Sequence, residues 1–164
     1  GMPVAMLRAP DLGKTGYESP SELEADAELK DRVESIRLQA GLMMNLGDVA
    51  DKTVPKISLI APAQHGGIVS TRTFIPHRVH EAIGVLGAVS VAAGCCIPGS
   101  VADGVTGIVD GGRLDVEHPT GRFTVDIDIA QERGDYRVTR SALLRTARKL
   151  MDGNVYVPEG LITC

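Results

Sequence analysis

The residues best suited to chemistry in this chain lie in a basic turn, IPHRVH at residues 75–80, which directly precedes an apolar segment. We expect residues 82–95 to form a helix without a polar face, enclosed by the rest of the domain. The first turn of such a helix has backbone N–H groups without intrahelical acceptors, and these groups favour anions. Together with the side chains nearby, they predict a site for a carboxylate-bearing small molecule. The basic side chains near this helix start are Arg72, His77, Arg78 and His80.

The same histidines could also bind a metal ion or have a structural role. His77 and His80 are three residues apart and could bind a metal ion, but a third ligand would have to come from His65 or His118. They could also cap the turn or pack at the surface. We expect no metal site.

A second turn, HPTG at residues 118–121, has two readings. Pro and Gly are common in hairpin turns, so the segment could simply connect two strands. It could also present the imidazole of His118 and the hydroxyl of Thr120 to a ligand. Cys95 and Cys96 lie at the far end of the apolar segment, away from the N–H donors that would lower a thiol pKa, so we expect them to pack in the core.

The surrounding pattern predicts the elements that hold these turns. Ser19, Pro20 and Glu22 form a helix-start signature with a capping box, and the helix should run to Gln39 or Ala40. Gly84 and Gly87 fall inside the apolar helix, where they predict close approach of a strand or ligand. Residues 141–151 fit either a helix or a strand. Strands are predicted at residues 3–8, 56–61, 68–75, 107–109, 113–117, 123–129, 136–139 and 154–157.

Composition excludes several classes of protein. The 164 residues have a formal net charge of −4, two Phe, three Tyr and no Trp, which argues against a nucleic-acid partner. No leader and no apolar run of membrane-spanning length is apparent, and three cysteines without a disulfide framework fit a reducing compartment. We therefore expect a soluble, cytoplasmic protein that is either one domain or half of a larger one.

The run PAQHGGIVSTRTFIPHRVHEAIGVLGAVSVAAGC resembles the PrpF family, as do LRAPDLGKTGYESPSELEAD before it and HPTGRF and RTARKLMDGNVYVP after it. That family includes 2-methylaconitate isomerase and 4-oxalomesaconate tautomerase, and the form IPHRVHEAIGVLGAVS looks more like the tautomerase branch. The resemblance covers nearly all of this chain but only the carboxy-terminal half of a typical member.

The resemblance implies an α+β fold of the diaminopimelate-epimerase type, in which each half wraps a mixed or antiparallel β-barrel around a central apolar helix. The active site of such enzymes lies between the halves and shifts an allylic proton on an unsaturated tricarboxylate, without a metal or organic cofactor. Their catalytic cysteine and lysine belong to the amino-terminal half. In the epimerase relatives a second cysteine precedes the matching helix, and Gly84 falls near that place, so no catalytic residue is assigned here.

We therefore interpret residues 1–164 as a single domain that corresponds to the carboxy-terminal, substrate-holding half. The expected partners are a di- or tricarboxylate and either an amino-terminal half or a second copy in a homodimer. The alternative is a non-catalytic half-domain or gene remnant that self-associates as a binding or structural module. The residues expected to bind substrate are Arg72, His77, His80, His118 and Thr120 through side chains, and Gly84, Val85 and Leu86 through backbone N–H groups.

Overall fold

A six-stranded mixed sheet, with strands in sequence order, organises the computed structural model, which describes residues 2–107, 109 and 111–157. The β1–β2 and β3–β4 pairs are parallel, and the other neighbouring pairs are antiparallel. Each parallel pair needs a long crossover, and the helices lie in these two connections. The strands are β1 (Val4–Arg8), β2 (Lys56–Ala61), β3 (Val69–Phe74), β4 (Gly112–His118), β5 (Gly121–Glu132) and β6 (Asp135–Leu143).

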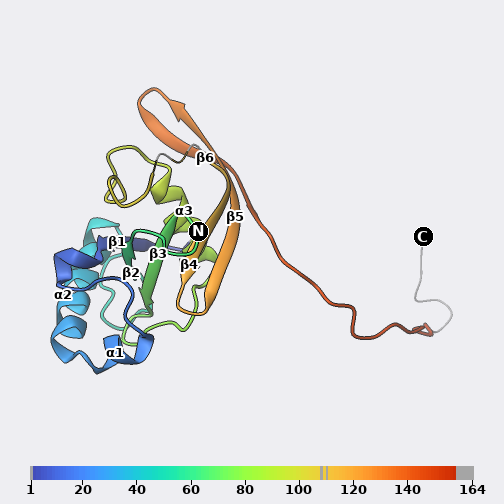
Figure 1. Ribbon diagram of the computed structural model, residues 1–164, viewed down its shortest axis with the longest axis horizontal. Coiled ribbons are helices and arrows are strands. Elements are labelled where there is room, and N and C mark those ends of the chain that lie inside the picture. Colours follow the sequence, from blue (N-terminus) through green and yellow to red (C-terminus); the bar gives the residue numbers. More distant parts are fainter. Residues whose placement is uncertain (1, 108, 110, 158–164) are drawn as a thin grey trace.

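The helices cover both faces of this sheet (Figure 1). A short 3-10 helix, η1 (Ala9–Leu12), precedes α1 (Pro20–Ala25) and α2 (Ala27–Met43), and α3 (Val85–Cys95) follows β3. Side chains alternate along β2, so Ile57 and Leu59 pack in the cluster under α1 and α2, while Ile60 packs in the cluster under α3. No helix within the described residues is long and apolar enough to cross a membrane.

The predicted helix start at Ser19 is confirmed, because both hydrogen bonds of the capping box with Glu22 are present. The prediction of one continuous helix is wrong. Asp26 adopts an extended conformation after α1, and its carboxylate accepts a hydrogen bond of 2.9 Å from the N–H of Leu29. Asp26 thus caps a second helix, which then continues to Met43, past the predicted end.

The apolar helix α3 is shorter and less enclosed than predicted. Gly84 is its N-cap rather than an interior residue, and Leu86 is 49% exposed. The described strands form a half-barrel on one side of α3, so a barrel wrapped around the whole helix is not confirmed. The buried side of the helix is formed by Gly87, Ala88, Val91, Ala92 and Cys95.

Of the close approach of a strand or ligand predicted at Gly84 and Gly87, the approach of a strand is wrong. A Cβ at Gly84 would meet nothing within 4 Å, and one at Gly87 would lie 3.8 Å from Ile83. The tight contact lies near the carboxyl end of α3, at Gly94, where a Cβ would lie 2.6 Å from the sulfur of Met6 in β1. Gly94 is therefore the residue that lets α3 pack against β1.

Two further strand predictions do not hold. Gly107 and Val109 are not in a strand, and residue 108 lies outside the described residues, as does Cys164. The predicted strand at residues 154–157 is wrong, because residues 144–157 form no helix or strand. The ambiguous segment 141–151 resolves into the end of β6, up to Leu143, followed by irregular chain.

Arg37 fixes the connection from α2 to β2. Its side chain is 0% exposed and makes two hydrogen bonds of 2.7 Å with the carboxylate of Glu34. One guanidinium nitrogen, Nη1, also donates to three carbonyl oxygens of the connection, those of Val49, Lys52 and Val54, at 3.0, 3.1 and 2.9 Å. A buried charge paired this fully keeps the start of β2 in place.

Replacing Arg37 with Met should lower the free energy of unfolding by about 3–5 kcal/mol, because the change leaves Glu34 unpaired and buried carbonyl groups without a donor. Urea denaturation followed by circular dichroism measures the effect. The matched control is Arg32→Met, since the exposed Arg32 makes only a 3.3 Å bond to the carbonyl of Asp11. Equal stabilities of the two variants would contradict this role for Arg37.

Candidate functional site

Two pockets contain most of the residues singled out in the sequence. The arginine pocket has a volume of about 280 Å³ and is lined by Gln64, His65, Ser70, Arg72, Glu117, His118, Pro119, Gly121 and Arg122. The helix pocket has a volume of about 310 Å³ and is lined by Met2, Lys56, Thr73, Ile75, His80, Gly84, Val85, Leu86 and Gly87. Arg72 and Thr73 are successive residues of β3, so the two pockets lie on opposite faces of that strand.

Arg72 is the main cation of the arginine pocket. The residue is only 9% exposed, its Nε donates to the carbonyl of Glu18, and its Nη1 donates to the carbonyl of Thr71 at 2.9 Å. Within the described part of the chain, no carboxylate oxygen lies within 4.0 Å of it. Burial lowers the pKa of Arg72, against the opposing effect of Glu18 and Tyr17, but a guanidinium stays charged in proteins. A buried cation without a counter-ion is suited to binding an anion.

Glu117 holds the loop that closes this pocket. Its carboxylate accepts hydrogen bonds from the N–H groups of Gln64, His65 and Gly67 at 2.8, 2.6 and 2.9 Å. Burial alone would raise the pKa of Glu117, but these N–H groups outweigh it and hold the pKa below its usual value. The loop approaches so closely that a Cβ at Gly67 would lie 2.6 Å from the carbonyl oxygen of Asp115. The charge of Glu117 is therefore engaged by the backbone.

The HPTG turn both joins two strands and contributes to the pocket. His118 ends β4 and pairs with Gly121 at the start of β5. The hydroxyl of Thr120 donates to the carbonyl of Glu81 at 3.0 Å and lies 3.3 Å from Nδ1 of His118. Burial lowers the pKa of His118, as do the nearby His80 and Arg72, so its imidazole is neutral at pH 7. The turn is thus tied to the segment that leads into α3.

The helix pocket contains the uncapped start of α3. No side chain caps Gly84, and the N–H groups of the first turn have no intrahelical acceptor. His80 is held beside this turn, since its backbone N–H donates to the carbonyl of Thr73 at 2.8 Å and its Nδ1 accepts from the N–H of Ala82 at 3.0 Å. In the neutral ring, Nε2 must then carry the proton.

Lys56 is a pocket residue that the sequence reasoning missed. It begins the strand KISLIA and lines the helix pocket, and burial lowers its pKa, with a smaller effect from the charge of Arg37. Among the residues the structure describes, no acidic oxygen lies within 4.0 Å of its amine. The feature of the sequence that could have indicated this role is the lysine at the start of a mostly apolar strand.

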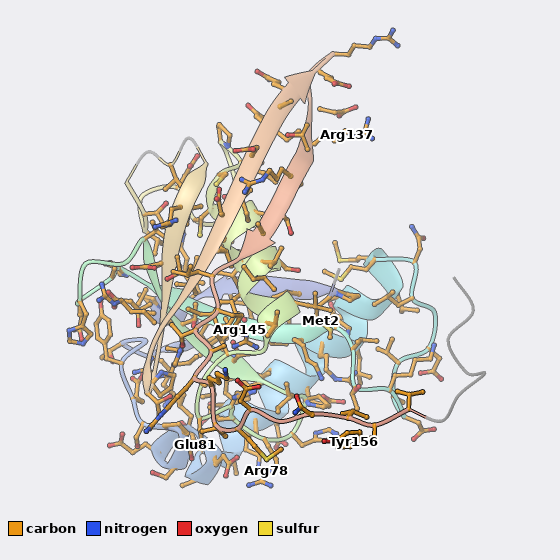
Figure 2. The ribbon with its side chains drawn as sticks, turned by 90° about the vertical axis from the view of Figure 1, so that its right-hand side faces the viewer. Met2, Arg78, Glu81, Arg137, Arg145 and Tyr156 are labelled. Carbon is orange, nitrogen blue, oxygen red and sulfur yellow. The ribbon has the colours of Figure 1, made fainter. Side chains whose placement is uncertain are left out.

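His77 and Arg78 point away from both pockets. The side chain of His77 is 66% exposed, with Nδ1 3.9 Å from the carboxylate of Glu34, and Arg78 is 83% exposed beside Glu24. Figure 2 shows Arg78 at one end of the molecule and Arg137 of the β5–β6 hairpin at the other. The structure therefore divides the basic turn, placing His80 in a pocket and His77 on the surface.

Cys95 is not suited to act as a nucleophile. Cys95 and Cys96 are buried at the end of α3, and burial raises the pKa of the Cys95 thiol to about 12. At neutral pH that thiol stays protonated. No group of three or more potential metal ligands occurs in the described ranges of the chain.

Comparison with known proteins identifies the family. The family model described as "PrpF protein" matches residues 1–158. The chain belongs to the PrpF family. It is 54% identical over 159 residues to a (4E)-oxalomesaconate Delta-isomerase of Novosphingobium sp., and 54% identical over 159 residues to a 4-oxalomesaconate tautomerase of Pseudomonas putida. A 2-methyl-aconitate isomerase of Shewanella oneidensis is 28% identical over 176 residues.

These matches cover 96–97% of this chain but only 43–44% of each relative, so the chain spans less than half the length of the PrpF proteins it resembles. The fold is also similar to the crystal structure of a methylitaconate-delta-isomerase, with a TM-score of 0.67 and 16% sequence identity. That match covers 86% of this chain and 43% of the other. The resemblance noted in the sequence is confirmed, and the named relatives of this PrpF chain are isomerases.

Glu117→Gln should loosen the loop at residues 64–67 and lower the free energy of unfolding by about 2 kcal/mol. The amide keeps one neutral acceptor oxygen, and its NH2 group replaces the other acceptor and faces a backbone N–H. Because the folded-state pKa of Glu117 is lowered, its stabilisation is complete above the unfolded pKa and is lost as pH falls through the folded value. The variant should therefore lose less stability than the parent on acidification below pH ~4.5.

Chemical denaturation across this pH range, with amide exchange of residues 64–67, measures both effects. The exposed Asp128, replaced in Asp128→Asn, provides the matched control. A variant with unchanged stability and unchanged loop exchange would refute the anchoring role of Glu117.

Proposed function

We propose that this chain is the carboxy-terminal, substrate-holding half of a PrpF isomerase that shifts an allylic proton on an unsaturated tricarboxylate of the 4-oxalomesaconate or methylaconitate type. The observation that carries the proposal is Arg72, a buried guanidinium without a carboxylate partner on the wall of a pocket. Relatives named for these substrates support the choice of ligand.

The arginine pocket would take one carboxylate of the substrate. Arg72 supplies the charge, and the neutral imidazole of His118 supplies a polar contact beside it. The hydroxyl of Thr120 donates to the carbonyl of Glu81 and lies 3.3 Å from Nδ1 of His118, so it would position the imidazole rather than contact the carboxylate itself. Glu117 lines the same pocket, but its carboxylate is engaged by three N–H groups and so opposes an incoming anion less than a bare carboxylate would.

The helix pocket lies on the other face of β3 and would offer a separate carboxylate site at the start of α3. Gly84 leaves the first turn open, and Val85 and Leu86 offer backbone N–H groups, with His80 beside them. Removal of an allylic proton builds negative charge on an enolate-like intermediate, and fixed N–H donors and a cation stabilise that charge. The groups that move the proton are expected in the portion of the protein that this chain does not span.

Arg72→Met should weaken binding of cis-aconitate, a stable unsaturated tricarboxylate, by about 10- to 100-fold, because one charge-assisted contact is lost. Isothermal titration calorimetry with the purified chain measures the affinity. His77→Ala is the matched control and should change affinity less than twofold, since His77 lies on the surface beside Glu34. If Arg72→Met folds normally and binds as tightly as the parent, the proposal fails.

Affinity should also depend on pH through His118. Its pKa is lowered in the free protein, and a bound carboxylate would favour the imidazolium and raise that pKa. Binding should therefore take up protons and tighten as pH falls from 7.5 to 6, with at most about tenfold per pH unit for one proton.

Calorimetry in buffers of different ionisation enthalpy counts the protons taken up. His118→Gln should remove most of this uptake, whereas His65→Gln, in the same pocket, should retain it. The ligand's own titration is common to all variants. Identical proton uptake in the His118 variant and the parent would show that His118 does not face the ligand.

A further inference from the structure

The chain leaves the body of the molecule after β6 and runs away from it (Figure 1). Its last contacts with the body are the N–H of Leu144 on the carbonyl of Thr124, at 3.3 Å, and the guanidinium of Arg145, 5.1 Å from the ring centre of Phe123. For residues 146–157, here called the terminal segment, the polar contact in the described structure is the Lys149–Asp152 ion pair, which is internal to the segment. Within the residues that the structure describes, the terminal segment thus makes no polar contact with the body of the molecule.

The composition of the terminal segment is not that of a solvated tail. Leu150, Met151 and Val155 are each 88% exposed, and Tyr156 is 91% exposed. Segments that stay disordered contain few aromatic and β-branched residues, because such side chains gain free energy when buried. Four large apolar side chains within seven residues instead indicate an interaction surface.

The terminal segment also belongs to the part of the chain that matches the family. The PrpF model extends to residue 158, and the two relatives that are 54% identical match over 159 residues. Those relatives are more than twice as long as the matched region, which covers 44% and 43% of them. The portion of the relatives that this chain does not match can therefore provide the surface on which the terminal segment packs.

We propose that the terminal segment docks on the companion portion of the PrpF protein, the part that this chain does not span. Residues 154–157, NVYV, favour a strand but have no strand partner among the described residues, so their N–H and C=O groups can pair with a sheet edge of the companion portion. Leu150 and Met151 then cover apolar surface beside that edge. The inference rests on the proposed function in one respect, the assignment of this chain as one half of the isomerase.

The test co-expresses the full chain with the unmatched portion of the Pseudomonas putida 4-oxalomesaconate tautomerase and measures the affinity of the complex. Met151→Asp and Tyr156→Asp should each weaken the complex at least tenfold. They should leave the melting temperature of the isolated chain unchanged, because these side chains are 88% and 91% exposed. Leu42→Asp and Met43→Asp are the matched controls, since these residues, at the end of α2, are also exposed, by 65% and 84%, and should change affinity less than twofold.

A photo-crosslinker placed at position 156 identifies the surface that receives the segment. Crosslinking to the companion portion is the expected result. Crosslinking to a second copy of this chain, a complex indifferent to the Met151 and Tyr156 variants, or the absence of any complex would each overturn the inference.

The same preparations separate this inference from the proposed function. Arg72→Met should leave the affinity of the complex unchanged while it abolishes turnover of 4-oxalomesaconate. A complex that depends on the terminal segment but neither binds cis-aconitate nor turns over substrate would refute the function and keep the docking. If the complex turns over substrate and the terminal-segment variants do not change its affinity, the proposed function is supported and the docking is refuted.

Discussion

The fold depends on a short joint between two parts of its sheet. Strands β3 and β4 pair in parallel at only two positions, Val69 with Val116 and Ser70 with Glu117. Glu117 reinforces this joint, since its carbonyl oxygen accepts a 2.7 Å hydrogen bond from the hydroxyl of Thr71 while its carboxylate binds the loop at residues 64–67. One buried residue thus connects the loop, β3 and β4.

This constraint also explains where the pockets lie. The arginine pocket is built from β3, the end of β4 and the loop that Glu117 holds, so its shape follows from the joint. The Thr120–Glu81 hydrogen bond then ties the β4–β5 turn to the chain that enters α3 and the helix pocket. The charges follow the same arrangement. Among the described residues no carboxylate oxygen lies within 4.0 Å of Arg72, whereas the carboxylate of Glu117 beside it accepts three N–H hydrogen bonds.

Local patterns were predictable from the sequence, and features set by distant contacts were not. The capping box at Ser19, the strand KISLIA and the alternation along residues 123–129 depend on near neighbours and were found. The break at Asp26 is an exception, because Asp is a favoured N-cap residue and its bond to Leu29 is local, but the helical spacing of the apolar residues continues across it. The positions of His77 and Lys56 depend on their tertiary surroundings. The strand predicted at residues 154–157 lacks a partner among the described residues.

The two-pair joint also has a consequence for the order of folding. Strands β4, β5 and β6 form a meander of contacts close in sequence, which assemble quickly, whereas β3 and β4 meet only after the intervening crossover with α3 is in place. The arginine pocket lies across that late contact. We therefore expect the arginine pocket to form late in folding, together with the β3–β4 contact.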